Sequence, residues 1–166
     1  MISRFHHITQ DVTGFTHAQL ADLACKGGAD WIQLRVKGKS NDEWLEIASE
    51  TKSICQKHNA KLIINDSVRI AKEIGADGVH LGKQDMPVVE ARKILGKNFI
   101  IGGTANSFTD EEELTKAGVD YIGLGPFRFT KTKGKLSPLL GLEGISNIIN
   151  QTKQFKNMPP IIAIGG

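Results

Sequence analysis

The sequence predicts a single α/β domain of the TIM-barrel type, in which parallel strands alternate with helices. Short apolar runs of strand length alternate with longer amphipathic stretches of helical period along the 166 residues. The pattern Gly-x-Asp recurs at residues 28–30, 75–77 and 118–120, and each copy closes an expected helix and opens an expected strand. Two βα units fit between successive copies, which gives about 22 residues per unit, a length typical of a TIM-type barrel.

Seven strands are expected from the apolar runs, at residues 5–9, 31–37, 62–64, 79–81, 99–105, 121–126 and 161–164. Because these runs are almost continuously apolar, the strands should be covered on both faces. The helix at 16–26 is followed by Gly27 and Gly28, and the next helix begins with a capping box of Ser40 and Glu43. Further helices are expected between the third and fourth strands and at residues 87–95, 110–117 and 142–151.

A closed barrel of this type has eight strands, so the eighth βα unit is expected to be absent from this sequence. Residues 1–166 would then form a single TIM-barrel domain truncated at its C-terminal end. The first and seventh strands would be unpaired edges. The expected full chain is about 40 residues longer, which corresponds to two further units at the repeat length.

Composition narrows the class of protein. A mass of 18.1 kDa allows a core without disulfide or metal staples, and a formal net charge of +3 does not indicate nucleic-acid binding. Cys25 and Cys55 lie in expected helices without CxxC spacing, so we expect reduced core thiols. No apolar run approaches the roughly 20 residues that span a bilayer, and the first residues lack a signal-peptide layout. We therefore expect a cytoplasmic protein with no nucleic-acid or membrane partner.

Two carboxylates follow neighbouring expected strands. Asp66 comes directly after the third strand, and Asp85 follows the fourth. Since the carboxyl ends of parallel strands meet at one edge of a sheet, both should face one cleft. Two carboxylates there suit Mg²⁺, which binds through oxygen ligands and substrate phosphate. The alternative is that each aspartate caps a helix N-terminus, because Asp66 precedes Ser-Val-Arg-Ile and Asp85 precedes Met-Pro.

Other polar groups fall at the same expected edge. Gln33, Arg35 and Lys37 alternate along one face of the second strand, which is unusual for a strand buried on both sides. The loop 128–135 holds four cations, two hydroxyls and a glycine, which fits either a clamp on phosphates or a solvated basic loop. Gly165 and Gly166 would let backbone N–H groups approach a phosphate. His80, inside an apolar run, is expected to be structural.

Seven segments in order along the chain resemble the thiamine phosphate synthase family. They are Gln-Leu-Arg-Val-Lys at 33–37, Ile-Asn-Asp at 64–66, Gly-Ala-Asp-Gly-Val-His-Leu-Gly at 75–82 with Asp85, Gly-Leu-Gly-Pro at 123–126, Thr-Lys-Thr-Lys at 130–133, Gly-Leu-Glu-Gly at 141–144 and Ala-Ile-Gly-Gly at 163–166. The resemblance covers essentially the whole chain.

The resemblance implies a Mg²⁺-dependent transferase. It would condense 4-amino-2-methyl-5-hydroxymethylpyrimidine diphosphate with hydroxyethylthiazole phosphate, giving thiamine phosphate and pyrophosphate. By this likeness Asp66 and Asp85 hold the metal, and Arg35, Lys37 and Lys133 are catalytic cations that stabilise the leaving pyrophosphate. The implied substrate contacts are Gln33, Arg35, Lys37, Asn65, Thr104, Thr130, Thr132, Lys133, Gly165 and Gly166. The implied partners are these small molecules, and a homo-oligomer is left open.

The sequence also departs from the family pattern. Val36 stands where the family usually has an acid, Lys83 and Gln84 replace a polar-acidic pair, and residues 128–129 replace an apolar-proline pair. Two alternatives therefore stand beside the synthase. One is a non-catalytic paralogue that binds thiazole phosphate or thiamine phosphate. The other is a thiazole tautomerase, which Asn106 argues against because the related tautomerases use a histidine near that position.

Overall fold

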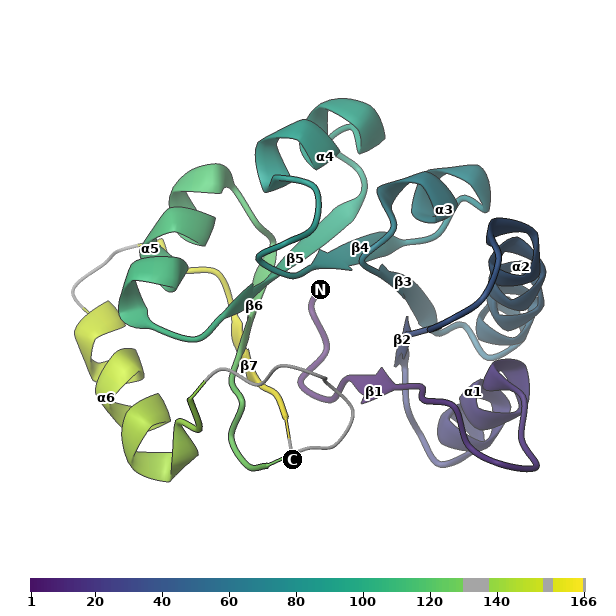
Figure 1. Cartoon of the computed structure of the whole chain (residues 1–166), viewed down its shortest axis with the longest axis horizontal. Coiled ribbons are helices and arrows are strands. Elements are labelled where there is room, and N and C mark those ends of the chain that lie inside the picture. The colour runs from purple at the N-terminus through teal and green to yellow at the C-terminus, as the bar shows by residue number, and fades with distance from the viewer. Residues whose placement is uncertain (130–137, 154–156, 166) are drawn as a thin grey trace.

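The computed structural model describes residues 1–129, 138–153 and 157–165. Its strands are β1 (His7–Ile8), β2 (Trp31–Leu34), β3 (Lys61–Asn65), β4 (Gly78–Leu81), β5 (Ile100–Ala105), β6 (Tyr121–Leu124) and β7 (Ile161–Ala163). They form one sheet in chain order, and every neighbouring pair is parallel. The sheet is curled, with the helices along its outer side (Figure 1). The predicted α/β class and TIM-like curvature are confirmed, whereas the absence of an eighth unit stays a prediction.

The helices are α1 (His17–Lys26), α2 (Asn41–Lys57), α3 (Val68–Glu73), α4 (Val88–Leu95), α5 (Phe108–Ala117) and α6 (Gly141–Thr152). Local sequence explains most of the N-termini. The predicted capping box of Ser40 and Glu43 starts α2, and a second box of Thr16 and Gln19 starts α1. Ser67 and Ser107 cap α3 and α5 through their hydroxyls.

Successive residues of a strand point to opposite faces of the sheet, and they form two separate hydrophobic cores. Side chains such as Ile32, Leu34 and Ile64 pack outward against the helices. Trp31, Ile63 and Tyr121 pack together on the inner face of the sheet. The N-terminal segment fills this inner space, since Ile2 packs against the same cluster and the His6 ring stacks on Trp31 at 4.4 Å. Figure 1 accordingly shows the N-terminus in the middle of the curled sheet.

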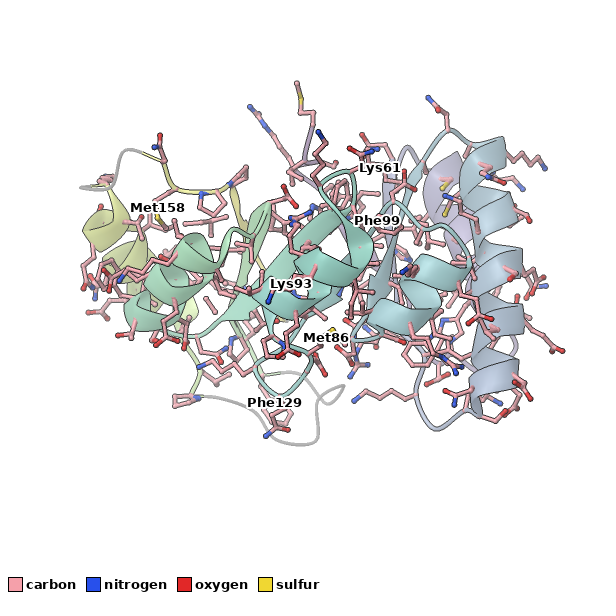
Figure 2. The ribbon with its side chains drawn as sticks, turned by 90° about the horizontal axis from the view of Figure 1, so that it is seen from above. Lys61, Met86, Lys93, Phe99, Phe129 and Met158 are labelled. Atoms are coloured by element: carbon pink, nitrogen blue, oxygen red, sulfur yellow. The ribbon has the colours of Figure 1, made fainter. Side chains whose placement is uncertain are left out.

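The two ends of the strands form two distinct rims. Lys61 begins β3, Phe99 precedes β5 and Met158 precedes β7, and these three lie toward one side in Figure 2. Met86 follows β4 and Phe129 follows β6, and both lie toward the opposite side (Figure 2). We call this second side, where the strands end, the C-terminal rim. None of the helices within the described ranges is long and apolar enough to cross a membrane.

Several predicted boundaries were wrong by a few residues. β2 ends at Leu34 rather than Lys37, and β1 comprises two residues rather than five. The polar residues after Leu34 alternate with the period of a strand, although the hydrogen-bonded ladder ends at Leu34. Helix α5 begins two residues earlier than expected because Ser107, which the prediction passed over, is its cap.

Cys25 and Cys55 are free thiols as expected, and burial raises the pKa of Cys55 to about 12.

Candidate active site

Asp66 lies at the C-terminal rim in a constrained backbone conformation. Its φ of 67° is in the left-handed region, which residues other than glycine adopt at a cost. Its backbone N–H donates to the His80 carbonyl at 2.8 Å, so pairing between β3 and β4 continues to this residue. The capping alternative is wrong for Asp66, because the Ser67 hydroxyl accepts the Ile70 N–H and caps α3. The Asp66 side chain is exposed at the rim.

Asp85 lies in the loop that follows the adjacent strand. Its Oδ2 accepts the Gly82 N–H at 2.6 Å, and its own N–H donates to the Gly82 carbonyl at 3.2 Å. These two bonds close a tight turn directly after β4. The capping alternative is wrong here as well, because Pro87 occupies the N-cap position of α4 and no side chain caps that helix. The structure therefore brings both predicted carboxylates to the same rim, after adjacent strands.

An amide pair lies just inside this rim. The Gln33 Nε2 donates to the Asn65 Oδ1 at 2.7 Å, and both side chains are buried. Gln33 is on β2 and Asn65 is the last residue of β3, so the bond joins neighbouring strands on their inner face. This contact explains how the inner face of β2 tolerates a polar residue.

Arg35 and Lys37 follow β2 rather than lying on it. The backbone N–H of Arg35 donates to the Thr9 hydroxyl at 3.2 Å. Partial burial lowers the pKa of Arg35, and the negative charges of Asp66 and Asp11 oppose that effect. Arg35 therefore shares an electrostatic environment with the predicted metal ligand Asp66. Lys37 is exposed at the start of the loop that leads to α2.

His80 is a structural residue, as predicted. Its Nδ1 lies 3.0 Å from the Tyr121 hydroxyl and its Nε2 lies 2.9 Å from the Thr104 hydroxyl, all in the buried interior. Burial raises the pKa of Tyr121, so its hydroxyl stays protonated and can donate. Thr104, predicted to line the substrates, is thus a partner of His80 just below the rim.

Asn106 ties the ends of β5 and β6 together. Its side-chain Nδ2 donates to the Gly125 carbonyl, and its backbone N–H donates to the Asp110 carboxylate at 2.8 Å. Lys83, one of the departures from the family pattern, makes an ion pair with the same Asp110 at 2.7 Å. Val36, another departure, is buried in the outer core. The departures at 36 and 83 therefore both have partners within the fold, Val36 in the outer core and Lys83 on Asp110.

Gly165 lies next to the loop after β6. Its φ is 83°, and a Cβ at this position would come within 2.9 Å of Pro126 Cα. Its carbonyl accepts the Arg128 N–H at 2.8 Å. Close packing against Pro126 therefore requires this glycine, and the predicted phosphate contact stays a prediction. Thr130, Thr132, Lys133 and Gly166 lie outside the described residues.

Sequence reasoning missed three residues of the first βα unit, namely Thr9 and Asp11 after β1 and His17 at the start of α1. Thr9 is 1% exposed, and its Oγ1 lies 2.8 Å from His17 Nδ1. The His17 Nε2 lies 3.3 Å from Asp11 Oδ1. The available signal was a run of polar residues directly after the first strand. The contact between Thr9 and Arg35 depends on how two strands meet, so spacing in the sequence does not reveal it.

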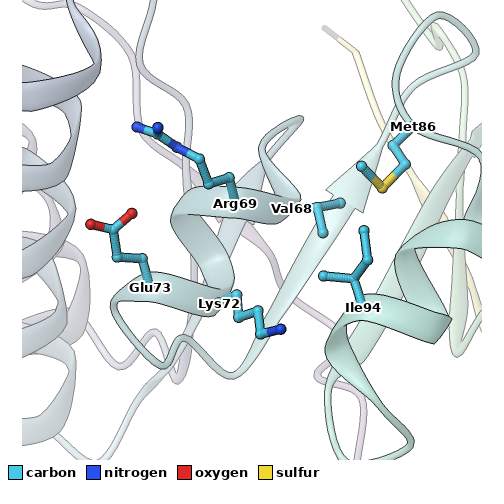
Figure 3. Close-up of a pocket in the computed structure, with 6 residues that line it drawn as sticks. All are labelled: Val68, Arg69, Lys72, Glu73, Met86 and Ile94. Carbon is cyan, nitrogen blue, oxygen red and sulfur yellow. The ribbon is translucent and has the colours of Figure 1, made fainter.

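A surface hollow lies elsewhere on the molecule. Val68, Met86 and Ile94 line it between α3 and α4, with Arg69, Lys72 and Glu73 along its edge (Figure 3). It contains neither of the two carboxylates nor Arg35, so it is not the site defined by the strand ends. Within the described ranges, no group of three or more His, Cys, Asp or Glu side chains could hold a metal by itself.

The fold and the rim define a TIM-type α/β protein with carboxylates, amides and cations at the carboxyl ends of its strands. The model of the thiamine monophosphate synthase family matches residues 6–166, and the chain belongs to this family.

Individual relatives agree with that assignment. A thiamine-phosphate synthase from Phocaeicola vulgatus is 53% identical over 159 residues, which cover 96% of this chain and 76% of the relative. One from Flavobacterium psychrophilum is 49% identical over all of this chain and 81% of its own length. The solved thiamine phosphate pyrophosphorylase from Pyrococcus furiosus superposes with a TM-score of 0.83 at 31% identity, covering 98% of this chain and 75% of that one.

Proposed function

We propose that this chain is a Mg²⁺-dependent transferase, a thiamine-phosphate synthase. It would join 4-amino-2-methyl-5-hydroxymethylpyrimidine diphosphate to hydroxyethylthiazole phosphate. The observation that carries the proposal is the position of Asp66 and Asp85 after adjacent strands, with Asp66 acting electrostatically on Arg35. The high identity to relatives named thiamine-phosphate synthase supports the same reaction.

The two carboxylates suit Mg²⁺ as a ligand pair. One Asp85 oxygen accepts the Gly82 N–H, and no other partner of this carboxylate is found in the described part of the chain. Two carboxylates do not complete the octahedral set that Mg²⁺ requires, so water and the diphosphate of the substrate would supply the remaining oxygens. The bound metal would neutralise the negative charge that grows on the leaving pyrophosphate.

The protein side chains would hold both ends of the pyrimidine substrate. Arg35, Lys37 and Lys133 would bind the diphosphate and stabilise it as it leaves. Gln33 uses its N–H₂ on Asn65, which orients the Gln33 Oε1 as an acceptor and the Asn65 Nδ2 as a donor. This pair is complementary to an aminopyrimidine, which offers an amino donor next to a ring-nitrogen acceptor. Thr104, Thr130 and Thr132 would line the substrates, and Gly165 and Gly166 would meet the thiazole phosphate.

The reaction needs little acid or base catalysis from the protein. The bond between the pyrimidine methylene carbon and the diphosphate oxygen breaks, and the electron pair leaves with pyrophosphate. The thiazole nitrogen then donates its lone pair to that carbon, forming the new C–N bond. Since no proton must move in either step, cations aimed at the leaving group are the main requirement, and these are the residues that the rim is proposed to supply.

A two-substrate assay tests the proposal. Purified protein is incubated with both substrates and Mg²⁺, and thiamine phosphate and pyrophosphate are quantified together. We expect equal amounts of the two products, loss of both on addition of EDTA, and recovery with excess Mg²⁺. Binding of thiamine phosphate in equilibrium dialysis without any turnover would instead support the non-catalytic paralogue.

We also propose that the protein works in the cytoplasm. Both cysteines are unbonded, and the buried Cys55 thiol resists ionisation because burial raises its pKa to about 12. Free thiols of this kind are typical of a reducing compartment. Fractionation of the producing cells, with detection of the tagged protein in the soluble cytosolic fraction, would test the location.

A further inference from the structure

A chain of polar contacts connects the first βα loop to the end of β2. Thr9 follows β1 directly, and its N–H donates to the Gln33 carbonyl at 2.9 Å, which is the last ladder bond between the two strands. Arg35 lies just beyond β2, and its N–H donates to the Thr9 side-chain oxygen at 3.2 Å. The backbone ladder between the two strands therefore ends here, and the acceptor of the Arg35 N–H is the Thr9 hydroxyl.

The partners of His17 define the direction of these hydrogen bonds when its imidazole is neutral. The Asp11 carboxylate can only accept, so the His17 Nε2 that faces it carries the proton. In the neutral imidazole the other nitrogen, Nδ1, is then an acceptor, and the Thr9 hydroxyl donates to it at 2.8 Å. The Thr9 oxygen lone pair accepts from Arg35. Thr9 and His17 thus each donate one hydrogen bond and accept another.

Burial makes this arrangement costly to break. Thr9 is 1% exposed and His17 is 7% exposed, so neither loses its partner to water without a penalty. Asp11 is mostly exposed; its carboxylate lies 3.3 Å from the His17 Nε2, and its charge acts on Arg35. The first loop therefore acts on Arg35 in two ways: the Thr9 hydroxyl accepts its backbone N–H, and the negative charge of Asp11 attracts its guanidinium.

We propose that Thr9, His17 and Asp11 are positioning residues that hold Arg35 in place for the diphosphate of the pyrimidine substrate. The proposal rests on the function proposed above. Arg35 lies beyond the last residue of β2, so the strand ladder alone does not fix its backbone. A cation that stabilises a leaving group must be held in position beforehand, because small displacements reduce the electrostatic gain. The Thr9 hydroxyl, oriented by His17 and Asp11, supplies that constraint.

The first experiment measures binding of inorganic pyrophosphate with Mg²⁺ by calorimetry, alongside steady-state kinetics for both substrates. Thr9→Val keeps the shape of the side chain and removes the hydroxyl. We expect it to weaken pyrophosphate binding about tenfold and to reduce kcat/KM for the pyrimidine diphosphate by a similar factor. The KM for the thiazole phosphate should stay the same. Thr9→Ser, which retains the hydroxyl, should restore most of the loss.

Variants of His17 separate its two contacts. His17→Leu should reproduce the effect of Thr9→Val. His17→Asn places an amide near the Nδ1 position and should retain the Thr9 contact, so it should bind pyrophosphate more tightly than His17→Leu. The matched control is His58→Asn, because His58 makes a similar contact with Asp22 at 2.7 Å between α2 and α1 and lies at the other end of the strands. This control should leave pyrophosphate binding unchanged.

A double-mutant cycle decides whether the effect passes through Arg35. If the proposal holds, Thr9→Val adds no further loss of pyrophosphate binding to Arg35→Ala. Additive losses, or equal losses for both substrates together with a lower melting temperature, would overturn it. If wild-type protein binds pyrophosphate but forms no thiamine phosphate, the proposed function fails, while the binding cycle still tests the positioning role. Unchanged pyrophosphate binding in Thr9→Val would refute the positioning role even in an active synthase.

Discussion

Glu111 on α5 is a fully buried carboxylate. Neither of its oxygens has a hydrogen-bond partner within the described part of the chain. Burial raises its pKa to about 7, and the negative charge of the neighbouring Asp110 adds to the effect. The folded protein therefore binds a proton at Glu111 more tightly than the unfolded chain does. The stability that this proton contributes is complete below the ordinary pKa of glutamate and is lost as the pH rises through about 7.

Replacing Glu111 with an apolar residue of similar length should stabilise the protein at alkaline pH. We expect Glu111→Met to raise the free energy of unfolding by about 1–3 kcal/mol at pH 8, because a buried group without a partner costs that much. The gain should shrink at pH 5, where Glu111 is protonated. Urea unfolding at both pH values measures it, with the exposed Glu113→Met on the same helix as control. A gain that does not change between the two pH values would contradict the account.

At the scale of the elements, the second and third copies of the Gly-x-Asp repeat each join two neighbouring strands. The Asp77 carboxylate accepts the Leu62 N–H at 2.9 Å, and the Asp120 carboxylate accepts the Ile101 N–H at 2.8 Å. In these two copies the backbone N–H of the aspartate also donates to the carbonyl of the same residue, Leu62 for Asp77 and Ile101 for Asp120. Burial acts to raise the pKa of Asp77, but the Leu62 N–H and two lysines outweigh it, so the pKa is lowered.

The first copy of the repeat is a natural control for the second. Asp30 accepts a hydrogen bond from the exposed Ser3 hydroxyl instead of a strand N–H. We expect Asp77→Ala to lower the free energy of unfolding by about 1–3 kcal/mol, since it leaves the Leu62 N–H without its partner. Asp30→Ala should cost much less, and Asp77→Asn, which keeps an oxygen acceptor, should lie between them. Equal losses for Asp77→Ala and Asp30→Ala in urea unfolding would show that the strand contact contributes nothing.

Local signals also explain which parts of the elements were predictable. The repeat and the capping box of α2 are short-range patterns, and the structure has them where the sequence indicates. Strand ends were less predictable, because a strand ends where its hydrogen bonds to the neighbouring strand end, and the sequence of one strand does not show this. The polar alternation at Gln33, Arg35 and Lys37 continues past Leu34, whereas pairing with β1 and β3 does not.

At the scale of the whole molecule, sequence order was enough to place the two carboxylates. Parallel strands in chain order bring their carboxyl ends together, so Asp66 and Asp85 could be assigned to one rim from the strand pattern alone. Contacts that depend on the packing of distant side chains were not predictable. The link from Asp11 and His17 through Thr9 to Arg35 and the bond between His80 and Tyr121 both join separate strands or loops, and no spacing in the sequence encodes them.

We propose that Asp66 and Asp85 together hold the Mg²⁺ that neutralises the leaving pyrophosphate. The most direct test is the Mg²⁺ dependence of thiamine phosphate formation in Asp66→Asn and Asp85→Asn. Asparagine at 85 keeps an oxygen that can accept the Gly82 N–H, so the turn after β4 should survive while the charge is lost. We predict that each variant keeps its melting temperature and loses turnover by at least about 100-fold at saturating Mg²⁺, because a metal contributes several kcal/mol. Wild-type turnover in both variants at the same Mg²⁺ concentration would contradict the account.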